Sequence, residues 1–139
     1  MTDAAPRPFR FTRAFRLEHR REFDAVYAGK ARTLEGPLVV HAIPNEHGHH
    51  RLGLSIGRRL GNATRRTRLK RMIREAFRLD RGTWPGAYDL VVGARTHEPC
   101  TLDDYRAALG RAIDSAHRLW TKRATRQSKR ASDAPPPSE

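Results

Sequence analysis

A strand pattern, a long helical pattern and a second strand pattern follow one another between residues 51 and 95, and this order constrains the fold more than any other feature. Residues 51–56 (RLGLSI) alternate in polarity with a period of two, and residues 63–79 carry apolar side chains at helical spacing. Residues 88–94 (YDLVVGA) are almost continuously apolar, as in a buried strand. A strand, a helix and a strand in this order predict a βαβ unit with parallel strands.

Shorter elements precede this unit. Residues 19–28 predict a helix that ends at the glycine after it, and residues 31–34 and 38–43 predict two strands separated by a Gly-Pro pair. Residues 44–48 predict a turn, so the strand at 51–56 should be the second arm of a hairpin with 38–43. Parallel and antiparallel pairs together indicate a mixed sheet.

The ends of the chain differ in composition from its middle. A final helix should begin at Thr101 and end near Lys122. We therefore expect one compact α+β domain over residues 9–122. Residues 1–8 should form a disordered arm, and residues 123–139 a disordered, basic and proline-rich tail.

Net charge is the strongest signal in the composition. The chain has 28 Lys and Arg against 15 Asp and Glu, a formal net charge of +13. Such a field concentrates polyanions, and the Arg-rich composition favours nucleic acid because guanidinium groups bind phosphate and stack on bases. The single cysteine, Cys100, allows no internal disulfide, and no apolar run is long enough to span a bilayer. We expect a cytoplasmic protein that binds nucleic acid and no membrane.

The strongest candidate for a binding surface is the segment 51–78, in which ten residues are Arg or Lys and one, Glu75, is acidic. On a helix at 100° per residue the apolar and basic side chains separate. The expected core face consists of Leu69, Met72, Ile73, Ala76 and Phe77. The residues expected to contact a polyanion are Arg58, Arg59, Asn62, Arg65, Arg66, Arg68, Lys70, Arg71 and Arg74. Like charges repel one another along a helix. Either a bound polyphosphate neutralises this repulsion, or the basic face is exposed to solvent and has no binding partner.

Aromatic and basic side chains also interleave in residues 9–16, where the residues in question are Phe9, Arg10, Phe11, Arg13, Phe15 and Arg16. They could stack on a single strand and neutralise it, or the rings could pack on the core. Three histidines, His47, His49 and His50, fall in the predicted turn, where we expect solvent around them and no metal. The sequence contains no phosphate loop and no nucleophile elbow, so no catalytic residue is predicted.

Residues 60–74 match a known signature. The bacterial ribonuclease P protein carries the pattern apolar-x-x-Ala-x-x-Arg-Asn-basic-apolar-Lys-Arg-x-apolar-basic, which this chain resembles at Leu60, Ala63, Arg66, Arg68, Leu69, Lys70, Arg71, Ile73 and Arg74. One position departs from the pattern, because Thr67 stands where the family has Asn, and a hydroxyl cannot make the bidentate contact of an amide. With the order of the other elements, the resemblance covers about residues 10–121.

The resemblance implies a fold and two binding sites. The fold is an α+β sandwich in the order αβββαβα with a left-handed βαβ crossover, although general rules favour the right-handed form. The basic loop and helix would bind the RNA subunit, and a cleft between the first helix and the sheet would take the single-stranded 5′ leader of precursor tRNA. The matching cleft positions, rings first and rim arginines after, are Phe23, Tyr27, His41, Arg13, Arg16 and Arg95.

The implied function is that of the protein subunit of an endoribonuclease that removes the 5′ leader of precursor tRNA. In this family catalysis and the required Mg²⁺ belong to the RNA subunit, and the protein itself binds no cofactor. The expected partners are ribonuclease P RNA and precursor tRNA, without DNA, and the protein should be monomeric without RNA. The main alternative is a ribosomal-protein-like RNA-binding protein with no role in cleavage. An autonomous nuclease and a DNA-binding regulator are further alternatives.

Overall fold

Four strands form one mixed sheet in a computed structural model that describes residues 13–133. The elements follow in the order η1 (Arg13–Phe15), α1 (Arg20–Ala28), β1 (Arg32–Glu35), β2 (Leu38–Pro44), β3 (Arg51–Ser55), η2 (Arg58–Leu60), α2 (Ala63–Asp80), η3 (Arg81–Thr83), β4 (Tyr88–Ala94) and α3 (Leu102–Asp133). With the short 3-10 turns (η) set aside, the predicted order αβββαβα is confirmed. The predicted arm at 1–8, and Phe9, Arg10 and Phe11, lie outside the described residues.

The strands are arranged in the order β1-β2-β4-β3. β3 and β4 pair in parallel, with Leu52 opposite Leu90, which confirms the βαβ unit. The predicted hairpin of 38–43 with 51–56 is wrong, because β4 lies between β2 and β3 and pairs antiparallel with β2. The first five residues of β4 are buried, and its central place gives both of its edges a partner. The hairpin that forms joins β1 to β2, and Gly36 in its turn has a φ of 53°.

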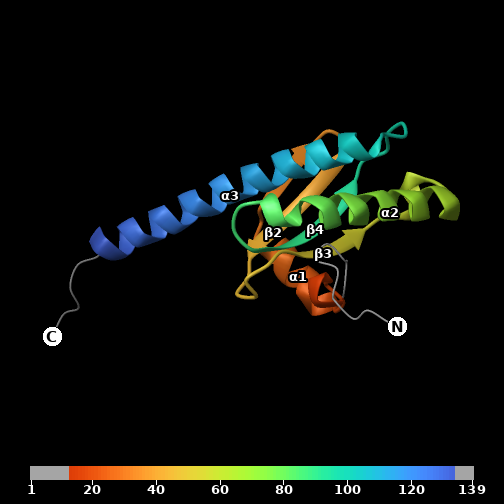
Figure 1. Cartoon of the computed structure of the whole chain (residues 1–139). Helices are drawn as coiled ribbons and strands as arrows, with labels where there is room; N and C mark the ends of the chain where they lie inside the picture. The colour runs from red at the N-terminus through yellow and green to blue at the C-terminus, as the bar shows by residue number, and fades with distance from the viewer. Residues whose placement is uncertain (1–12, 134–139) are drawn as a thin grey trace, which may run out of the picture.

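The crossover from β3 through α2 to β4 is left-handed. In Figure 1, α2 lies in front of the sheet, β3 and β4 both run from left to right, and β4 lies above β3. The chain passes from β3 towards the viewer into α2 and returns behind it to β4. This path has the hand that the family resemblance implied, against the usual preference for right-handed crossovers.

The helices cover the two faces of the sheet unequally. α2 and α3 lie on one face, and α1 covers part of the other (Figure 1). Between the helix pair and the sheet lies the main core, whose fully buried members include Leu38, Val40, Ala42, Ile73, Ala76, Phe77, Leu90, Val92, Leu109 and Ile113. The predicted core face of α2 is confirmed, with Met72 half-buried. The face under α1 holds a smaller cluster, and Leu34 on β1 stays 46% exposed.

The end of α1 shows why a glycine stands there. The predicted cap, Gly29, keeps a right-handed conformation, and the left-handed residue is Lys30, with a φ of 52°. A Cβ on Gly29 would lie 2.3 Å from Cγ2 of Ile43. Gly29 therefore allows α1 to approach β2 closely, and a positive φ is not its role.

The last helix is longer than the sequence predicted. The predicted end near Lys122 and the predicted disordered tail are wrong for residues 123–133, because α3 continues to Asp133. These residues include good helix formers and no glycine or proline, and the first proline is Pro135. Arg123 also anchors the helix, because its guanidinium donates to the carbonyls of Gly29 and Lys30 at 2.6 and 3.0 Å.

Candidate nucleic-acid interface

The loop before α2 is shaped by its polar and glycine residues. Asn62 is the N-cap of α2, and its Oδ1 accepts a hydrogen bond from the backbone N–H of Arg65 at 2.9 Å. Gly61 has a φ of 120°, and a Cβ there would lie 2.7 Å from Cδ of Arg65. The loop thereby turns sharply into the helix and leaves Arg58 and Arg59 exposed beside its N-terminus.

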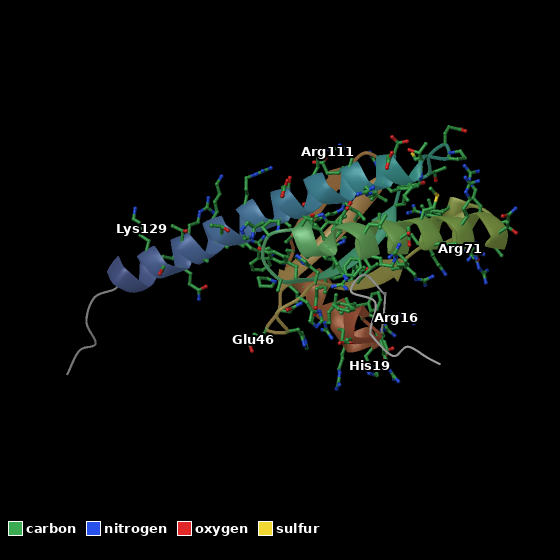
Figure 2. The ribbon with its side chains drawn as sticks, viewed as in Figure 1. Arg16, His19, Glu46, Arg71, Arg111 and Lys129 are labelled. Carbon is green, nitrogen blue, oxygen red and sulfur yellow. The ribbon has the colours of Figure 1, made fainter. Side chains whose placement is uncertain are left out.

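Among residues 13–133, the basic side chains of this loop and helix have no acidic partners, except for Arg78, which pairs with Glu75. Within residues 13–133, no ion pair involves Arg58, Arg59, Arg65, Arg66, Arg68, Lys70, Arg71 or Arg74. Arg65 donates to the carbonyl of His97 at 3.0 Å and Arg66 to that of Gly61 at 3.1 Å, which leaves both charges uncompensated. In Figure 2 nitrogen-bearing side chains, Arg71 among them, project outward around the N-terminal half of α2. We call these eight side chains the α2 basic surface.

Phe23 on α1 is the first of the predicted leader-cleft residues. Its ring lies against the backbone of Gly53, where a Cβ would be 2.6 Å from Cζ of the ring. A hollow of about 210 Å³ opens beside it, lined also by Arg16, Lys70 and Arg74. The structure thus joins two sets that the sequence treated separately, because Lys70 and Arg74 belong to the α2 basic surface and also border the predicted leader cleft.

Two more predicted cleft residues form a pair. The rings of Tyr27 on α1 and His41 on β2 meet edge to face, with centroids 4.8 Å apart. Tyr27 is 40% exposed, so part of its ring is open to a ligand. Burial, assisted by the charge of Arg32, lowers the pKa of His41, which favours the neutral form of its imidazole.

The two remaining rim arginines lie apart from this hollow. Arg13 is exposed and pairs with Glu18, with 3.2 Å between Nε and Oε2. Arg95 follows β4, and its guanidinium donates to the carbonyl of Gly36 in the β1–β2 turn. Neither side chain lines the hollow beside Phe23. A role for them in leader binding stays a prediction.

A partly buried ionic network, which was not predicted from the sequence, fixes α1. Arg51 on β3 makes two hydrogen bonds to Asp89 on β4, at 2.8 and 2.6 Å, and one to Glu22 on α1 at 3.0 Å. Hydrogen bonds from the backbone of His19 and Glu18, together with Arg51, lower the pKa of Glu22 to about 2. The available signal was Asp89, an acid inside an otherwise apolar strand pattern. Through this network α1 holds Phe23 and Tyr27 over the sheet.

A second hollow, of about 330 Å³, lies where α2 begins. Arg65 and Arg68 line it from α2, Cys100 lines it from the loop before α3, and Tyr105 lines it from the first turn of α3. The Tyr105 hydroxyl lies 2.8 Å from Nε2 of His97. This hollow extends the α2 basic surface towards the loop before α3.

The histidine turn is only partly solvated. His50 is buried, and its Nδ1 accepts the backbone N–H of Tyr88 at 3.1 Å, so the expectation of a solvated turn is wrong for this residue. Among the described residues, no group of three or more His, Cys, Asp and Glu side chains is placed to hold a metal ion. Nor does any helix in that part of the chain combine the length and apolar character needed to cross a membrane.

Comparison with known proteins identifies the family. The model of the ribonuclease P protein family matches residues 11–122, which include both predicted binding sites. The chain belongs to the ribonuclease P protein family. A relative from Methylococcus capsulatus, a ribonuclease P protein component, is 39% identical over 116 residues, which span 83% of this chain and 88% of the relative.

Solved ribonuclease P proteins have the same fold. The protein from Staphylococcus aureus aligns with a TM-score of 0.64 at 29% identity, over 73% of this chain and 94% of its own. The protein from Thermotoga maritima aligns with a TM-score of 0.64 at 32% identity, over 70% of this chain and 94% of its own. Both solved chains are covered almost completely, whereas more than a quarter of this chain has no counterpart in them. Residues 123–133 of α3 also lie beyond the match to the ribonuclease P family model.

The departure from the ribonuclease P signature lies on the surface. Thr67 is exposed on α2, between the basic residues Arg66 and Arg68. The amide that the family has at this position is absent, while the arginines on either side are present. The substitution therefore replaces an amide by a hydroxyl beside the α2 basic surface and leaves the charge of that surface intact.

Proposed function

We propose that this chain is the protein subunit of ribonuclease P, which binds the catalytic RNA and the 5′ leader of precursor tRNA and thereby promotes endonucleolytic removal of the leader. The observation that carries the proposal is the α2 basic surface. Its eight cationic side chains, two in the loop and six on the helix that matches the family signature, form no ion pair with any described residue. A polyanion supplies the missing counter-charge.

The α2 basic surface suits a folded RNA. Each Lys or Arg that neutralises a phosphate releases a condensed counterion, so affinity falls steeply with salt. The N-terminus of α2 adds unpaired N–H groups that favour an anion, next to Arg58 and Arg59. Phosphate contacts of this kind fix the orientation of the protein on the RNA.

The open face of the sheet suits a single strand. Unpaired bases stack on aromatic rings, while arginines and lysines bind the backbone between them. Phe23 and Tyr27 offer rings, and Arg16, Lys70 and Arg74 offer positive charge beside Phe23. The leader of a precursor that binds here is held close to the RNA subunit, because Lys70 and Arg74 belong to both surfaces.

The cleavage step itself is assigned to the RNA subunit and the Mg²⁺ ions that it binds. Hard divalent cations activate water and stabilise both oxygens in hydrolysis of a phosphodiester. In this proposal the chain's own residues hold the leader and neutralise phosphates, and none is catalytic. We further propose that the chain is cytoplasmic and monomeric in the absence of RNA.

Reconstitution with the cognate RNA tests the proposal. At low Mg²⁺, the protein and RNA together should cut precursor tRNA at the mature 5′ end much faster than the RNA alone, and the protein alone should not cut. If the protein failed to stimulate cleavage but bound ribosomal RNA tightly, the ribosomal-protein-like alternative would be correct. If the RNA-free protein cut at that position, the assignment of catalysis to the RNA would be wrong.

A further inference from the structure

The C-terminal part of α3 projects beyond the rest of the domain as a basic arm. Figure 1 shows the helix continuing past the sheet and past both other helices. Between Asp114 and Asp133 the helix has no acidic residue, and it carries six basic ones: Arg118, Lys122, Arg123, Arg126, Lys129 and Arg130. The only apolar side chain from 121 to 130 is Ala124. The arm therefore has no apolar face for a protein groove or a membrane, and its charge fits a polyanion.

Four of the six basic residues lie on one side of this arm. At 3.6 residues per turn, Arg118, Lys122, Arg126 and Lys129 all fall within about 60° of Arg111 around the helix axis. Arg111 marks the β1 side of α3, because its Nε is 3.0 Å from Oε2 of Glu35 on β1. Figure 2 shows Arg111 and Lys129 on the same side of the helix.

The α2 side of α3 points in another direction. Arg106 marks it, with two hydrogen bonds to Asp80 at the end of α2, at 3.0 and 2.8 Å. Seen along the axis, Arg106 lies more than about 90° from each of the six basic residues. The basic side of the arm therefore does not continue the α2 basic surface.

Where the arm leaves the domain, it is fixed to the backbone that follows Tyr27 at the end of α1 and His41 on β2. Arg123 bonds to the carbonyls of Gly29 and Lys30, which follow Tyr27 in the chain, and its guanidinium lies 4.6 Å over the ring of Trp120. Trp120 in turn donates to the carbonyl of Ala42 on β2 at 2.8 Å, next to His41. The arm is thus held in a defined direction from the end of the predicted leader cleft.

We propose that residues 118–130 form a second RNA-binding surface, which takes the single-stranded 5′ leader of precursor tRNA beyond the Tyr27–His41 pair. This inference rests on the proposed function, because it needs a leader in the cleft. It assigns a role to a segment of which residues 123–130 lie outside the family match. A single-stranded leader that extends past Tyr27 would reach the basic side chains of residues 118–130, a segment that contains no Asp or Glu.

The test uses the full chain in the reconstituted holoenzyme. One variant carries Arg126→Gln, Lys129→Gln and Arg130→Gln, since Gln keeps helix propensity while it removes charge. A matched control carries the same three changes together with Thr121→Lys, Ala124→Lys and Ser128→Lys, which restore the net charge on the opposite side of the helix. Affinities are measured across a salt series for precursors with a long and a short leader, for mature tRNA and for the catalytic RNA.

Both variants should bind the long-leader precursor roughly tenfold or more weakly than the wild type, with a salt slope lower by about 2, since each phosphate contact of a single strand contributes about 0.7. Binding of mature tRNA and of the catalytic RNA should not change. Any of three results would overturn the proposal. The control could bind the long-leader precursor as tightly as the wild type does, or the variants could lose affinity for the catalytic RNA. The third result is an equal loss of affinity for the long-leader precursor and for mature tRNA.

A measurement on the wild type alone tests the proposal even if the substitutions unfold the C-terminal part of α3. With the wild-type holoenzyme, affinity should continue to rise as the leader is lengthened beyond the nucleotides that fill the cleft. A plateau at the cleft length would exclude a leader contact at the arm. If the wild type bound precursor and mature tRNA equally at every leader length, the proposed function would fail as well. This result therefore differs from the plateau, which would exclude only the arm.

Discussion

Two pairs of basic residues on α2 offer a sharp prediction, because they carry equal charge but lie in different places. Lys70 and Arg74 border the hollow beside Phe23, whereas Arg68 and Arg71 do not. We compare the double variant Lys70→Ala/Arg74→Ala with Arg68→Ala/Arg71→Ala. Each removes two charges that have no acidic partner among residues 13–133.

The expected magnitude follows from counterion release. Two lost phosphate contacts should lower the salt slope by about 1.8, which corresponds to roughly thirtyfold weaker binding of the catalytic RNA at physiological salt. Only Lys70→Ala/Arg74→Ala should also reduce the preference for leader-bearing precursor over mature tRNA. The free protein should be as stable as the wild type or up to about 1 kcal/mol more stable, because like-charge repulsion is relieved and alanine favours the helix.

The assay is equilibrium binding of labelled catalytic RNA from about 0.1 to 1 M salt, with urea unfolding of each free variant. If affinity and slope stayed at wild-type values for both pairs, α2 would not be the RNA-binding face. If either variant were destabilised by more than about 1 kcal/mol, the basic side chains would have structural partners, and no polyanion would be needed to explain them.

Three further predictions concern α1 and its contacts. Glu22→Gln should lower the free energy of unfolding at pH 7 by at most about 3 kcal/mol, because the native pKa of Glu22 is lowered. Urea unfolding should show this difference between variant and wild type shrinking as the pH falls from 4.5 to about 2, since protonation of Glu22 removes its contribution to stability. A difference independent of pH would contradict the ionic network. Phe23→Ala should weaken binding of leader-bearing precursor by about 1–3 kcal/mol more than binding of mature tRNA, whereas equal losses in the two titrations would indicate a folding defect. Gly29→Ala should destabilise the protein by about 1–3 kcal/mol, because the new methyl group would clash with Ile43. In thermal unfolding, the double variant Gly29→Ala/Ile43→Ala should lose less stability than the sum of the losses in the two single variants. Strict additivity of the losses would rule out that contact.

Local patterns were sufficient to predict the helices and their starts. Asn62 caps α2 as its residue type indicated, and Thr101 and Asp104 exchange hydrogen bonds of 3.0 and 3.1 Å at the start of α3. Apolar spacing identified the faces of α2, because the helical period is a property of neighbouring residues. The end of α3 was missed, since the basic composition after Lys122 resembles a disordered tail and the anchor of Arg123 on α1 is a long-range contact.

Strand pairing was harder to predict, because it depends on residues far apart in the sequence. The turn at 44–48 made a hairpin of the flanking strands the local choice, yet the burial of β4 required a central position and separated β2 from β3. The same arrangement decides the site. Because β3 stands at the edge beside α2, Lys70 and Arg74 reach the hollow that also contains Phe23. No pattern within α2 indicated that the two predicted surfaces meet.

The most direct test of RNA binding by the α2 basic surface is the identity of the RNA that copurifies with the protein from cells. Sequencing should yield predominantly one RNA of a few hundred nucleotides that cleaves precursor tRNA, and Lys70→Ala/Arg74→Ala combined with Arg68→Ala/Arg71→Ala should lose it. Recovery of ribosomal RNA instead, or an undiminished yield from the fourfold variant, would contradict the role assigned to this surface.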